Sequence, residues 1–436
     1  METLQEYLAR KNRELAFLAA CVRPDLPAPV ATGLLEVPRL KQALRTAQIA
    51  QAVTAHPDLL ETNVRPGRER RFEVFSLGYY YQRFDMNVAG PPIHPALTAD
   101  DAPALIRAER YFSSGMGAIS AALLALDALP EGPRRVLLPA DAYFETLQLL
   151  RSLPRRLEVE PQATLADLRA ALQAAPGGAV LYLDSIAAED PAALLSDLRA
   201  DALRLLVLDS TCYDRADPRL LAFAQAAEAL ALPALLLRSH QKLDHLGIEH
   251  GRLGSLVSLL PPQATAASHR LLRDLLAQAD TLRRLLGSAA VPTFLLPYAA
   301  DPAFLALNRE RLELMADRNA RAAAWLAARL PPGTVRAYHH GRFLTLTAAS
   351  LGDLPQARLE EAVEELAATA AQEGLPARRA ASFGFDFAAL TVFPDLPTGH
   401  ACLRVAFADH PWPVCEAICG LVLDWVRTVG KPFAEI

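Results

Sequence analysis

The chain has 436 residues, a hydrophobic content of 52% and a formal net charge of −5. This length and apolar content suffice for a large core divided into two or three domains. The acidic balance provides no basic stripe for a phosphate backbone, so we expect no nucleic-acid partner. The charged N-terminus lacks a secretory signal, and the longest uncharged stretches are too short or too polar to span a bilayer. We therefore expect a cytoplasmic protein without a membrane partner.

The first part of the chain predicts an N-terminal helical arm over residues 1–85. Two helical patterns, LQEYLARKNRELAFLAA and LLEVPRLKQALRTAQIAQAV, are followed by an Arg-rich stretch without clear periodicity. Short apolar runs then alternate with amphipathic helices, and the runs are RVLLPA, AVLYLDS, LRLLVLDST, PALLLRSH and GSLVSLL. Continuous apolar runs separated by helices are typical of strands buried on both faces of a mostly parallel sheet. The pattern predicts a large α/β domain over residues 86–288.

The remainder predicts a small C-terminal α+β domain over residues 289–436. One helical stretch follows the Pro-Pro pair at 261–262 and precedes this domain. A second helical stretch begins at residue 301 and ends at Pro331-Pro332-Gly333. After them, FLTLTAAS, LTVFP and CLRVAFA read as strands and LEEAVEELAATAAQE as a helix, with a closing helix at the end. No internal repeat is visible.

The cysteines and histidines do not predict a metal site. Cys415 and Cys419 are four residues apart on a predicted helix, but no second Cys/His pair at ligand spacing accompanies them. His240, His245 and His250 are five residues apart, a step that makes side chains diverge on a helix and alternate sides on a strand. We expect a buried cysteine pair and no metal.

Lysine is scarce, and one lysine has a distinctive position. The chain contains four lysines against forty arginines, and only Lys242 lies between an apolar strand and a Gly-rich segment. An amine can form an imine with a carbonyl compound, whereas a guanidinium cannot. Arginine-biased codon usage explains the scarcity of lysine but not this placement. Lys242 is therefore a candidate covalent anchor.

Polar residues follow several of the predicted strands, where ligands of open α/β sheets bind. Ser114, Gly115 and Met116 open a predicted helix, whose free N–H groups favour an anion such as phosphate; an ordinary Ser/Gly helix cap is the alternative. Asp209 ends an apolar strand and predicts a cationic partner such as a pyridinium nitrogen, although capping or pairing with an arginine is equally compatible. Ser239 precedes Lys242 by three residues and is a second phosphate donor.

These motifs occur together in an order that resembles a known family. SSGMGAIS, the Asp of LDST, the Ser-x-x-Lys strand end followed by LGS, and the late SFG…LRVAF pair resemble the cystathionine γ-lyase and methionine γ-lyase family of pyridoxal-phosphate (PLP) enzymes. The resemblance covers most of the chain, from about Tyr79 to Phe407. It implies fold type I, with a mostly parallel seven-stranded sheet in the large domain, and PLP as cofactor.

The resemblance also implies roles for individual residues. Lys242 would bond to PLP and shuttle protons, Asp209 would keep the ring nitrogen protonated, and Tyr143 would stack on the ring and act as an acid toward the leaving group. Arg404 and Ser382 would bind the substrate carboxylate. The remaining cofactor contacts would come from Ser114, Gly115, Met116, Ser239, Gln241 and, from a neighbouring subunit, Tyr81 and Arg83. A homodimer or homotetramer would follow.

The chain departs from the family pattern at two places near the expected cofactor. Asp184-Ser185-Ile186-Ala187-Ala188 replaces the usual Glu-[Ser/Thr]-Pro-x-Asn, so the side chain that would contact the PLP phenolic oxygen is missing. Gln241 replaces the usual Thr before the lysine, and the segment after Lys242 is longer than in the family. The first change predicts a different electronic tuning of the ring, and the extra residues after Lys242 predict a reshaped substrate pocket.

The activity implied by the resemblance is Cα deprotonation of an L-amino acid, followed by β- or γ-elimination or replacement of a heteroatom leaving group. A PLP-dependent aminotransferase using a 2-oxo acid is the alternative, because the superfamily shares these residues. A non-catalytic PLP-fold protein is a third hypothesis. The presence of the lysine, the aspartate and the carboxylate-binding arginine argues against it.

Overall fold

The computed structural model describes residues 2–22, 25–55, 69–78, 87–98, 102–153, 155–174, 177–248, 251–347, 355–394 and 401–429. Packing divides the chain into two compact units. We call Ile49–Gln241 with Gly251–Asp301 the sheet unit, and Met1–Gln48, Lys242–His250 and Pro302–Ile436 together the terminal unit. These units record which residues pack together, and the domain boundaries after residues 85 and 288 stay predictions.

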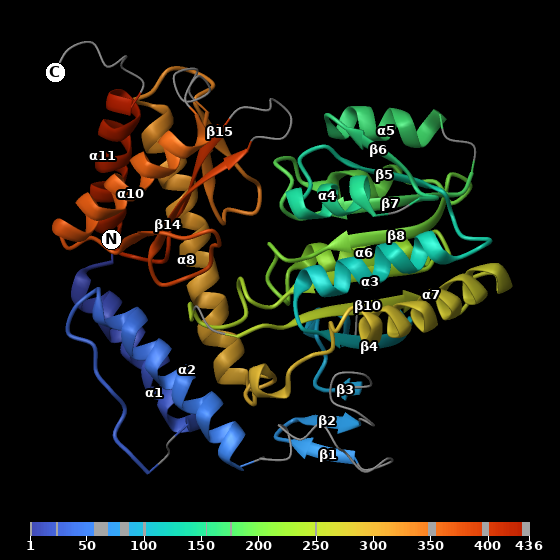
Figure 1. The fold of residues 1–436 in the computed structure, drawn as a ribbon, viewed down its shortest axis with the longest axis horizontal. Coiled ribbons are helices and arrows are strands. Elements are labelled where there is room, and N and C mark those ends of the chain that lie inside the picture. Colours follow the sequence, from blue (N-terminus) through green and yellow to red (C-terminus); the bar gives the residue numbers. More distant parts are fainter. Residues whose placement is uncertain are drawn as a thin grey trace. The chain divides into compact units, whose positions relative to one another are not determined.

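The sheet unit is built on a seven-stranded sheet in the order β4-β10-β9-β8-β7-β5-β6 (Figure 1). Its strands are β4 (Ile106–Phe112), β5 (Arg135–Pro139), β6 (Glu158–Gln162), β7 (Ala179–Asp184), β8 (Leu203–Asp209), β9 (Ala234–Ser239) and β10 (Gly254–Leu260). Strand β10 is antiparallel to both its neighbours, β4 and β9, and the pairs from β9 to β6 are parallel. The mostly parallel sheet predicted from the sequence is confirmed.

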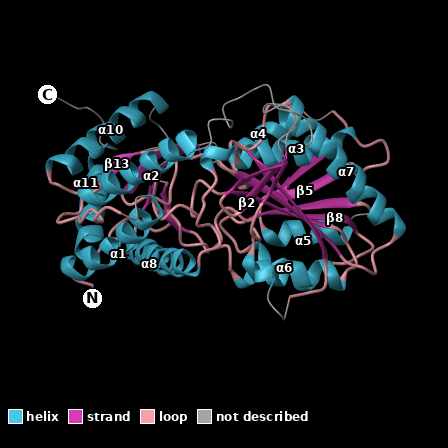
Figure 2. Ribbon diagram, turned by 90° about the horizontal axis from the view of Figure 1, so that it is seen from below, coloured by secondary structure: helices cyan, strands magenta, loops and turns pink. Residues whose placement is uncertain are grey.

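Helices cover both faces of this sheet. Figure 2 shows α3, α4 and α7 on one face and α5 and α6 on the other. Their bounds are α3 (Gly115–Ala128), α4 (Phe144–Ser152), α5 (Leu165–Ala174), α6 (Pro218–Ala229) and α7 (Ala266–Leu285). Because both faces are covered, the central strands are buried throughout and read as continuous apolar runs.

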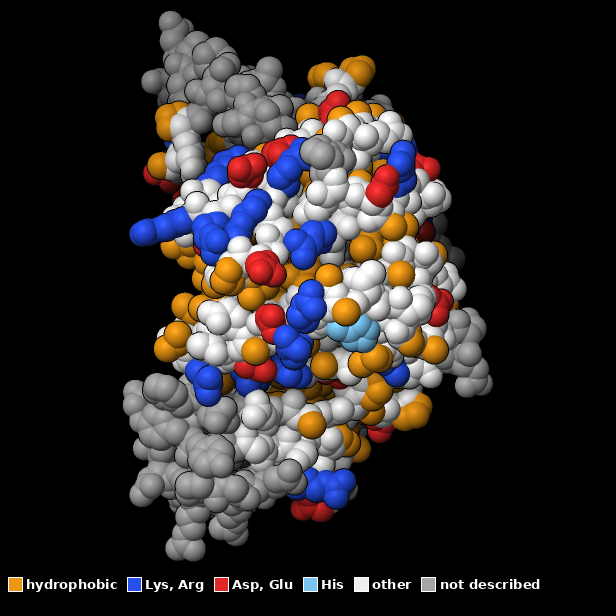
Figure 3. All heavy atoms as spheres, turned by 90° about the vertical axis from the view of Figure 1, so that its right-hand side faces the viewer, with side chains coloured by type: hydrophobic (Ala, Val, Ile, Leu, Met, Phe, Trp, Pro, Cys, Tyr) orange, Lys and Arg blue, Asp and Glu red, His pale blue; other side chains and the backbone are white. Residues whose placement is uncertain are grey.

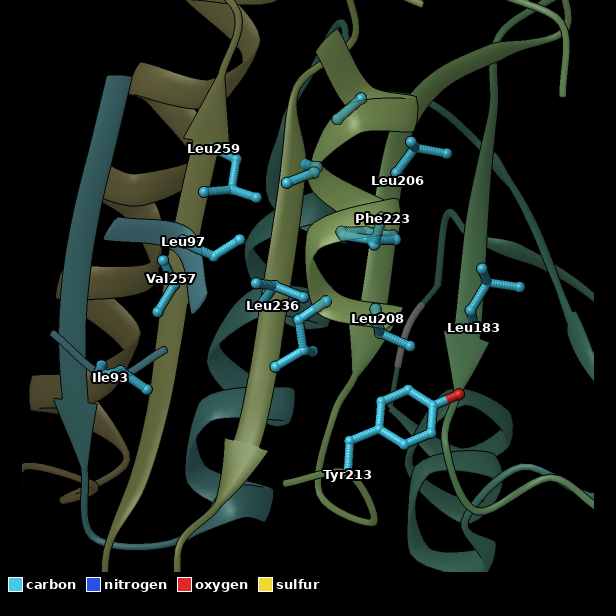
Figure 4. Close-up of a cluster of buried hydrophobic side chains, with 14 of the residues drawn as sticks. Ile93, Leu97, Leu183, Leu206, Leu208, Tyr213, Phe223, Leu236, Val257 and Leu259 are labelled. Carbon is cyan, nitrogen blue, oxygen red and sulfur yellow. The ribbon is translucent and has the colours of Figure 1, made fainter. Parts of the chain in front are cut away.

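The core of the sheet unit lies between the sheet and α6. Leu206 and Leu208 of β8, Leu236 of β9 and Leu259 of β10 project toward the α6 side, where Phe223 packs (Figure 4). None of the five side chains is more than 3% exposed. This apolar packing fixes the strands and therefore the positions of the residues that follow them.

A second, three-stranded antiparallel sheet forms where the sequence predicted irregular chain. It consists of β1 (Glu69–Phe72), β2 (Phe75–Gly78) and β3 (Asn87–Ala89). Phe72, Phe75 and Leu77 are buried, and Glu73 has φ 49° in the two-residue turn between β1 and β2. Short strands and interspersed arginines conceal the alternating apolar pattern, which explains why the prediction was wrong here.

The terminal unit combines the two N-terminal helices with a C-terminal α+β region that is built on one sheet. Its five-stranded sheet has the order β11-β12-β15-β14-β13, with β13 and β14 parallel and the other pairs antiparallel. The bounds are α1 (Leu4–Val22), α2 (Glu36–Ala55), which extends into the sheet unit, α8 (Pro302–Ala327), β11 (Val335–Ala337), β12 (Leu344–Leu346), α10 (Gln356–Gln372), β13 (Ala377–Arg379), β14 (Ala388–Pro394), β15 (Ala401–Ala406) and α11 (Trp412–Val429). Both predicted N-terminal helices and the small α+β region are confirmed.

Candidate functional site

Polar or aromatic residues lie at the carboxyl ends of five strands that point in one direction. Ser114 follows β4, Tyr143 follows β5, Asp184 ends β7, Asp209 ends β8 and Ser239 ends β9. Strands of equal direction deliver their following residues to the same edge of a sheet, where ligands of α/β folds bind. The sheet unit therefore brings four of the predicted residues, Ser114, Tyr143, Asp209 and Ser239, to one edge.

The first turn of α3 packs tightly against the end of β9. Ser114 caps the helix, since its side chain accepts a hydrogen bond from Gly117 N at 3.0 Å. The N–H groups of Gly115 and Met116 lie in the first turn, where the helix supplies no acceptor for them. A Cβ atom on Gly115 would lie 2.6 Å from Ser239 Cβ, so only glycine allows this approach. The helix cap predicted as an alternative is present. The N–H groups of Gly115 and Met116 next to it are suited to binding an anion.

Asp209 and Ser239 are joined through Thr211. Asp209 is 4% exposed, and its Oδ1 accepts hydrogen bonds from Thr211 N at 2.9 Å and from Thr211 Oγ1 at 2.5 Å. The same Thr211 hydroxyl oxygen accepts a hydrogen bond from Ser239 N at 2.9 Å. The ends of β8 and β9 are thus held together, and the carboxylate of Asp209 has a fixed orientation.

Asp184 anchors the start of the helix that follows Tyr143. Its Oδ2 accepts a hydrogen bond from Tyr143 N at 2.9 Å, and its Oδ1 accepts one from Ile186 N at 3.0 Å. Burial, and then the neighbouring charge of Asp209, raise the pKa of Asp184 well above its usual range. The ring of Tyr143 lies edge-on to that of Phe144, with centroids 5.0 Å apart. Asp184 thereby positions an aromatic side chain at the carboxyl edge of the sheet.

Lys242 lies in the turn after β9, three residues beyond the end of the strand at Ser239. The whole Ser-x-x-Lys motif was expected at the strand end, and this boundary is corrected because the strand ends at the serine of the motif, Ser239. Within the terminal unit, Lys242 Nζ donates a hydrogen bond to Ser382 Oγ at 2.5 Å and lies 5.5 Å from the ring centroid of Phe383. Lys242 and Ser382, two of the predicted site residues, are therefore in direct contact.

Arg404 is the third predicted residue of this group. It lies in the middle of β15, is 4% exposed, and donates through Nη2 to the carbonyl of Ala381 at 2.7 Å. Its guanidinium is 5.8 Å from the Phe383 ring centroid and 5.4 Å from that of Phe343. Aromatic faces and one carbonyl hold the guanidinium next to the segment that carries Ser382, an arrangement suited to binding a planar anion.

The other predicted residues have varied positions. Gln241 is half-buried in the turn that carries Lys242. His240 is 2.8 Å from Ser255 Oγ through Nε2, which gives it a partner inside the sheet unit. Cys415 and Cys419 are both buried on α11, as predicted for a helical pair. Tyr81, Arg83 and His250 lie outside the described residues.

Sequence reasoning missed two residues of the candidate site, Thr211 and Asp184. The signal for Thr211 was its spacing, since a threonine two residues after a strand-ending aspartate can hydrogen-bond back to the carboxylate. Asp184 was noted only as a departure from the family pattern. Its position as the last residue of an apolar strand, the same position as Asp209, was the available signal.

Among the described residues, no helix is long and apolar enough to cross a bilayer, and no group of three or more His, Cys, Asp or Glu side chains is arranged to hold a metal ion. On the face drawn in Figure 3, positive side chains are interspersed with acidic and apolar ones.

Comparison with known proteins identifies the fold. No protein-family model matches the chain, and no curated protein matches it. Among solved structures, MetB from Corynebacterium glutamicum has a TM-score of 0.54 at 16% identity, covering 84% of this chain and 92% of that one. CalE6 from Micromonospora echinospora is similar in two structures. The apo form, described as a methionine gamma lyase, has a TM-score of 0.52 at 17% identity, with 84% and 91% covered. The other, described as a cystathione gamma lyase, has a TM-score of 0.53 at 16% identity, with 84% and 92% covered. The chain has the fold of these structures, and the predicted fold class is confirmed.

Proposed function

We propose that the protein is a PLP-dependent enzyme that deprotonates an L-amino acid at Cα and then eliminates or replaces a heteroatom leaving group at the β or γ carbon. The observation that carries the proposal is the carboxyl edge of the sheet, where Gly115 packs against Ser239 and the buried carboxylate of Asp209 is oriented by Thr211. The activities named for structures with the same fold, a methionine gamma lyase and a cystathione gamma lyase, support the reaction class.

The residues present fit a phosphorylated pyridine aldehyde. The Gly115 and Met116 amides with the Ser239 hydroxyl would bind the phosphate. These groups can lie close together because Gly115 has no Cβ atom to collide with Ser239. Asp209 would pair with the protonated ring nitrogen and Tyr143 would lie against the ring. Only His240 and Gln241 separate Ser239 from Lys242, so covalent geometry keeps their Cα atoms within about 11 Å. Lys242 therefore follows the proposed phosphate donor closely in the chain.

When bound, PLP supplies an aldehyde that can bond to the amine of Lys242, and a protonated ring that withdraws electrons from the Cα atom of the substrate. Lys242 Nζ would remove the Cα proton, and Ser382, its partner at 2.5 Å, would hold the amine in position. Tyr143 would donate a proton toward the leaving group, and its backbone is fixed by Asp184. Arg404 would clamp the substrate carboxylate and orient the Cα–H bond.

Assembly and location are also part of this proposal. A homodimer or homotetramer, in which Tyr81 and Arg83 complete the phosphate site of a neighbouring subunit, follows from the resemblance, as does a cytoplasmic amino-acid enzyme. The longer segment after Lys242 would shape the substrate pocket.

A substrate panel tests the proposed reaction. The purified protein, supplied with PLP, is incubated with single amino acids and S-conjugates while ammonia and 2-oxo acid are measured. Release of both products from one amino acid supports elimination. Turnover that requires an added 2-oxo acid, with amino-group transfer and no ammonia, would identify an aminotransferase instead. Lys242→Ala should abolish either activity.

A further inference from the structure

The terminal unit contains a group of charged side chains that the proposed function does not use. We call it the buried charge cluster. Its members come from α1, α2, α8 and the loops that precede β14 and follow β15, and each is at most 4% exposed: Arg10, Lys11, Glu14, Lys41, Arg311, Asp386 and Asp409. Two of the four lysines in the chain belong to it.

The cluster is densely paired around Asp386. Lys11 Nζ is 2.8 Å from Asp386 Oδ1 and 2.7 Å from Asp409 Oδ2. Lys41 Nζ is 2.5 Å from Asp386 Oδ2, and Arg311 Nε is 3.2 Å from Asp386 Oδ1. Burial alone would raise the pKa of Asp386, but these three cations lower it well below its usual range. Charges this deeply buried are tolerated only while their partners remain in place.

The cluster holds the segment after Lys242 by one direct contact and one close approach. Lys41 Nζ donates a hydrogen bond to the carbonyl of Leu246 at 2.6 Å. A Cβ atom on Gly247 would lie 2.6 Å from the carboxylate of Asp386. Leu246 and Gly247 both have positive φ, 52° and 81°, a conformation that costs free energy at the leucine. The cluster supplies contacts that maintain this turn.

A second set of contacts connects the cluster to Lys242. It runs through Ser382, Gly384 and Asp386, which alternate along one short segment. Ser382 accepts the hydrogen bond from Lys242 Nζ. The carbonyl of Gly384 accepts a hydrogen bond from Arg311 Nη2 at 2.7 Å, and a Cβ atom on Gly384 would lie 1.9 Å from the carbonyl oxygen of Lys242. Asp386 is the centre of the cluster. The segment therefore connects the cluster to both the backbone and the amine of the lysine.

We propose that the buried charge cluster is a positioning device for Lys242, with Lys41 and Asp386 as the positioning residues. It fixes the chain on either side of the amine, through Leu246 and Gly247 after the lysine and through Ser382 and Gly384 against it. The N-terminal helices, which supply Lys11 and Lys41, thereby take part in preparing the amine for covalent chemistry. This inference rests on the proposed role of Lys242.

Amide hydrogen exchange in the full-length, PLP-free protein tests the inference without using activity. The variant Lys41→Met keeps the aliphatic length and removes the donor to Leu246. Exchange of the amides in residues 243–248 should become at least about tenfold faster, whereas exchange in β5 and β7 should be unchanged. The matched control is Glu310→Gln, which breaks the Arg13–Glu310 pair of the same unit, where the side chains are 61% and 43% exposed. It should leave both regions unchanged.

Two further arms complete the test. The rate at which PLP and borohydride label Lys242 should fall in Lys41→Met, while labelling of the N-terminal amine stays constant. If Lys41→Met does not fold, Gly247→Ala, which pushes a methyl group against Asp386, is measured by the same criteria. Exchange in residues 243–248 equal to that of the natural protein, or an increase spread evenly over the chain, would overturn the inference. A protein that shows the local exchange effect but never bonds PLP would instead refute the proposed function.

Discussion

Asp184 and Asp209 are register partners in the parallel strands β7 and β8, and each is the last residue of its strand. Both are buried, yet their surroundings differ. Asp184 accepts backbone N–H groups from Tyr143 and Ile186, and burial and the charge of Asp209 raise its pKa. Asp209 is oriented by the Thr211 hydroxyl. Two adjacent carboxyl groups in unequal environments allow one to act as a structural anchor and the other to face a cation.

Replacement of Asp209 by alanine tests the second of these roles. We expect kcat to fall by about 100-fold or more, the scale of losing one preorganised electrostatic contact. PLP should still bind, although more weakly, because the phosphate donors remain. Asp214→Ala, in the loop that follows the same strand, is the control and should keep its activity. Full turnover by Asp209→Ala would remove the aspartate from the mechanism.

Gly115→Ala should weaken PLP binding by about tenfold or more, equivalent to about 1.4 kcal/mol. The added Cβ would lie 2.6 Å from Ser239 Cβ and 3.0 Å from Ser239 Cα, so the first turn of α3 must move away from β9. The dissociation constant is measured by absorbance titration of PLP-free protein. In Gly420→Ala on α11, the new Cβ meets nothing within 4 Å, and binding should be unchanged. Equal affinities for the two variants would contradict the phosphate site.

Arg404→Lys should lower kcat/KM by about 10- to 100-fold, the scale of one lost charge-assisted hydrogen bond. Lysine keeps the charge but cannot donate two parallel N–H hydrogen bonds to a carboxylate. PLP affinity should not change, because the proposed partner of Arg404 is the substrate. Arg378→Lys, on the exposed part of β13, serves as the control. A loss of PLP affinity as large as the loss in kcat/KM would argue against a substrate-binding role.

Stability should fall as the pH drops from about 6.5 to about 4, in part through His410. Burial lowers the pKa of His410 to about 4, so in this range the unfolded chain binds a proton that the folded chain excludes. The shift corresponds to about 3 kcal/mol at its full extent. Urea unfolding of the natural protein and of His410→Gln at several pH values should give a stability difference that changes across this window. A difference independent of pH would show that His410 titrates normally.

Part of the fold and of the candidate site could be predicted from the sequence, because burial leaves a clear pattern there. The central strands β7, β8, β9 and β10 are covered on both faces and appeared as continuous apolar runs. The edge strands β4 and β6 gave no such signal, since IRAERYF and EVEPQ keep polar and charged side chains at the rim of the sheet. Candidate residues directly after central strands, such as Asp209 and Ser239, were therefore found.

Long-range relationships could not be predicted in this way. The pairing of Lys41 with Asp386 joins residues 345 positions apart, and each of these residues alone resembles an ordinary surface charge. Likewise, the contact of Gly384 with the Lys242 carbonyl depends on the folded path of two loops. Sequence patterns report local burial, whereas such contacts arise only from the tertiary arrangement.

The central claim is that the amine of Lys242 bonds covalently to PLP. The direct measurement is to incubate the protein with PLP, reduce with borohydride and locate the added mass by peptide mass spectrometry. With only four lysines in the chain, and Lys11 and Lys41 fully buried, the assignment is simple. We predict a single adduct on the peptide that contains Lys242, absent from Lys242→Ala. No adduct on that peptide, or an adduct that persists unchanged in Lys242→Ala, would contradict the account.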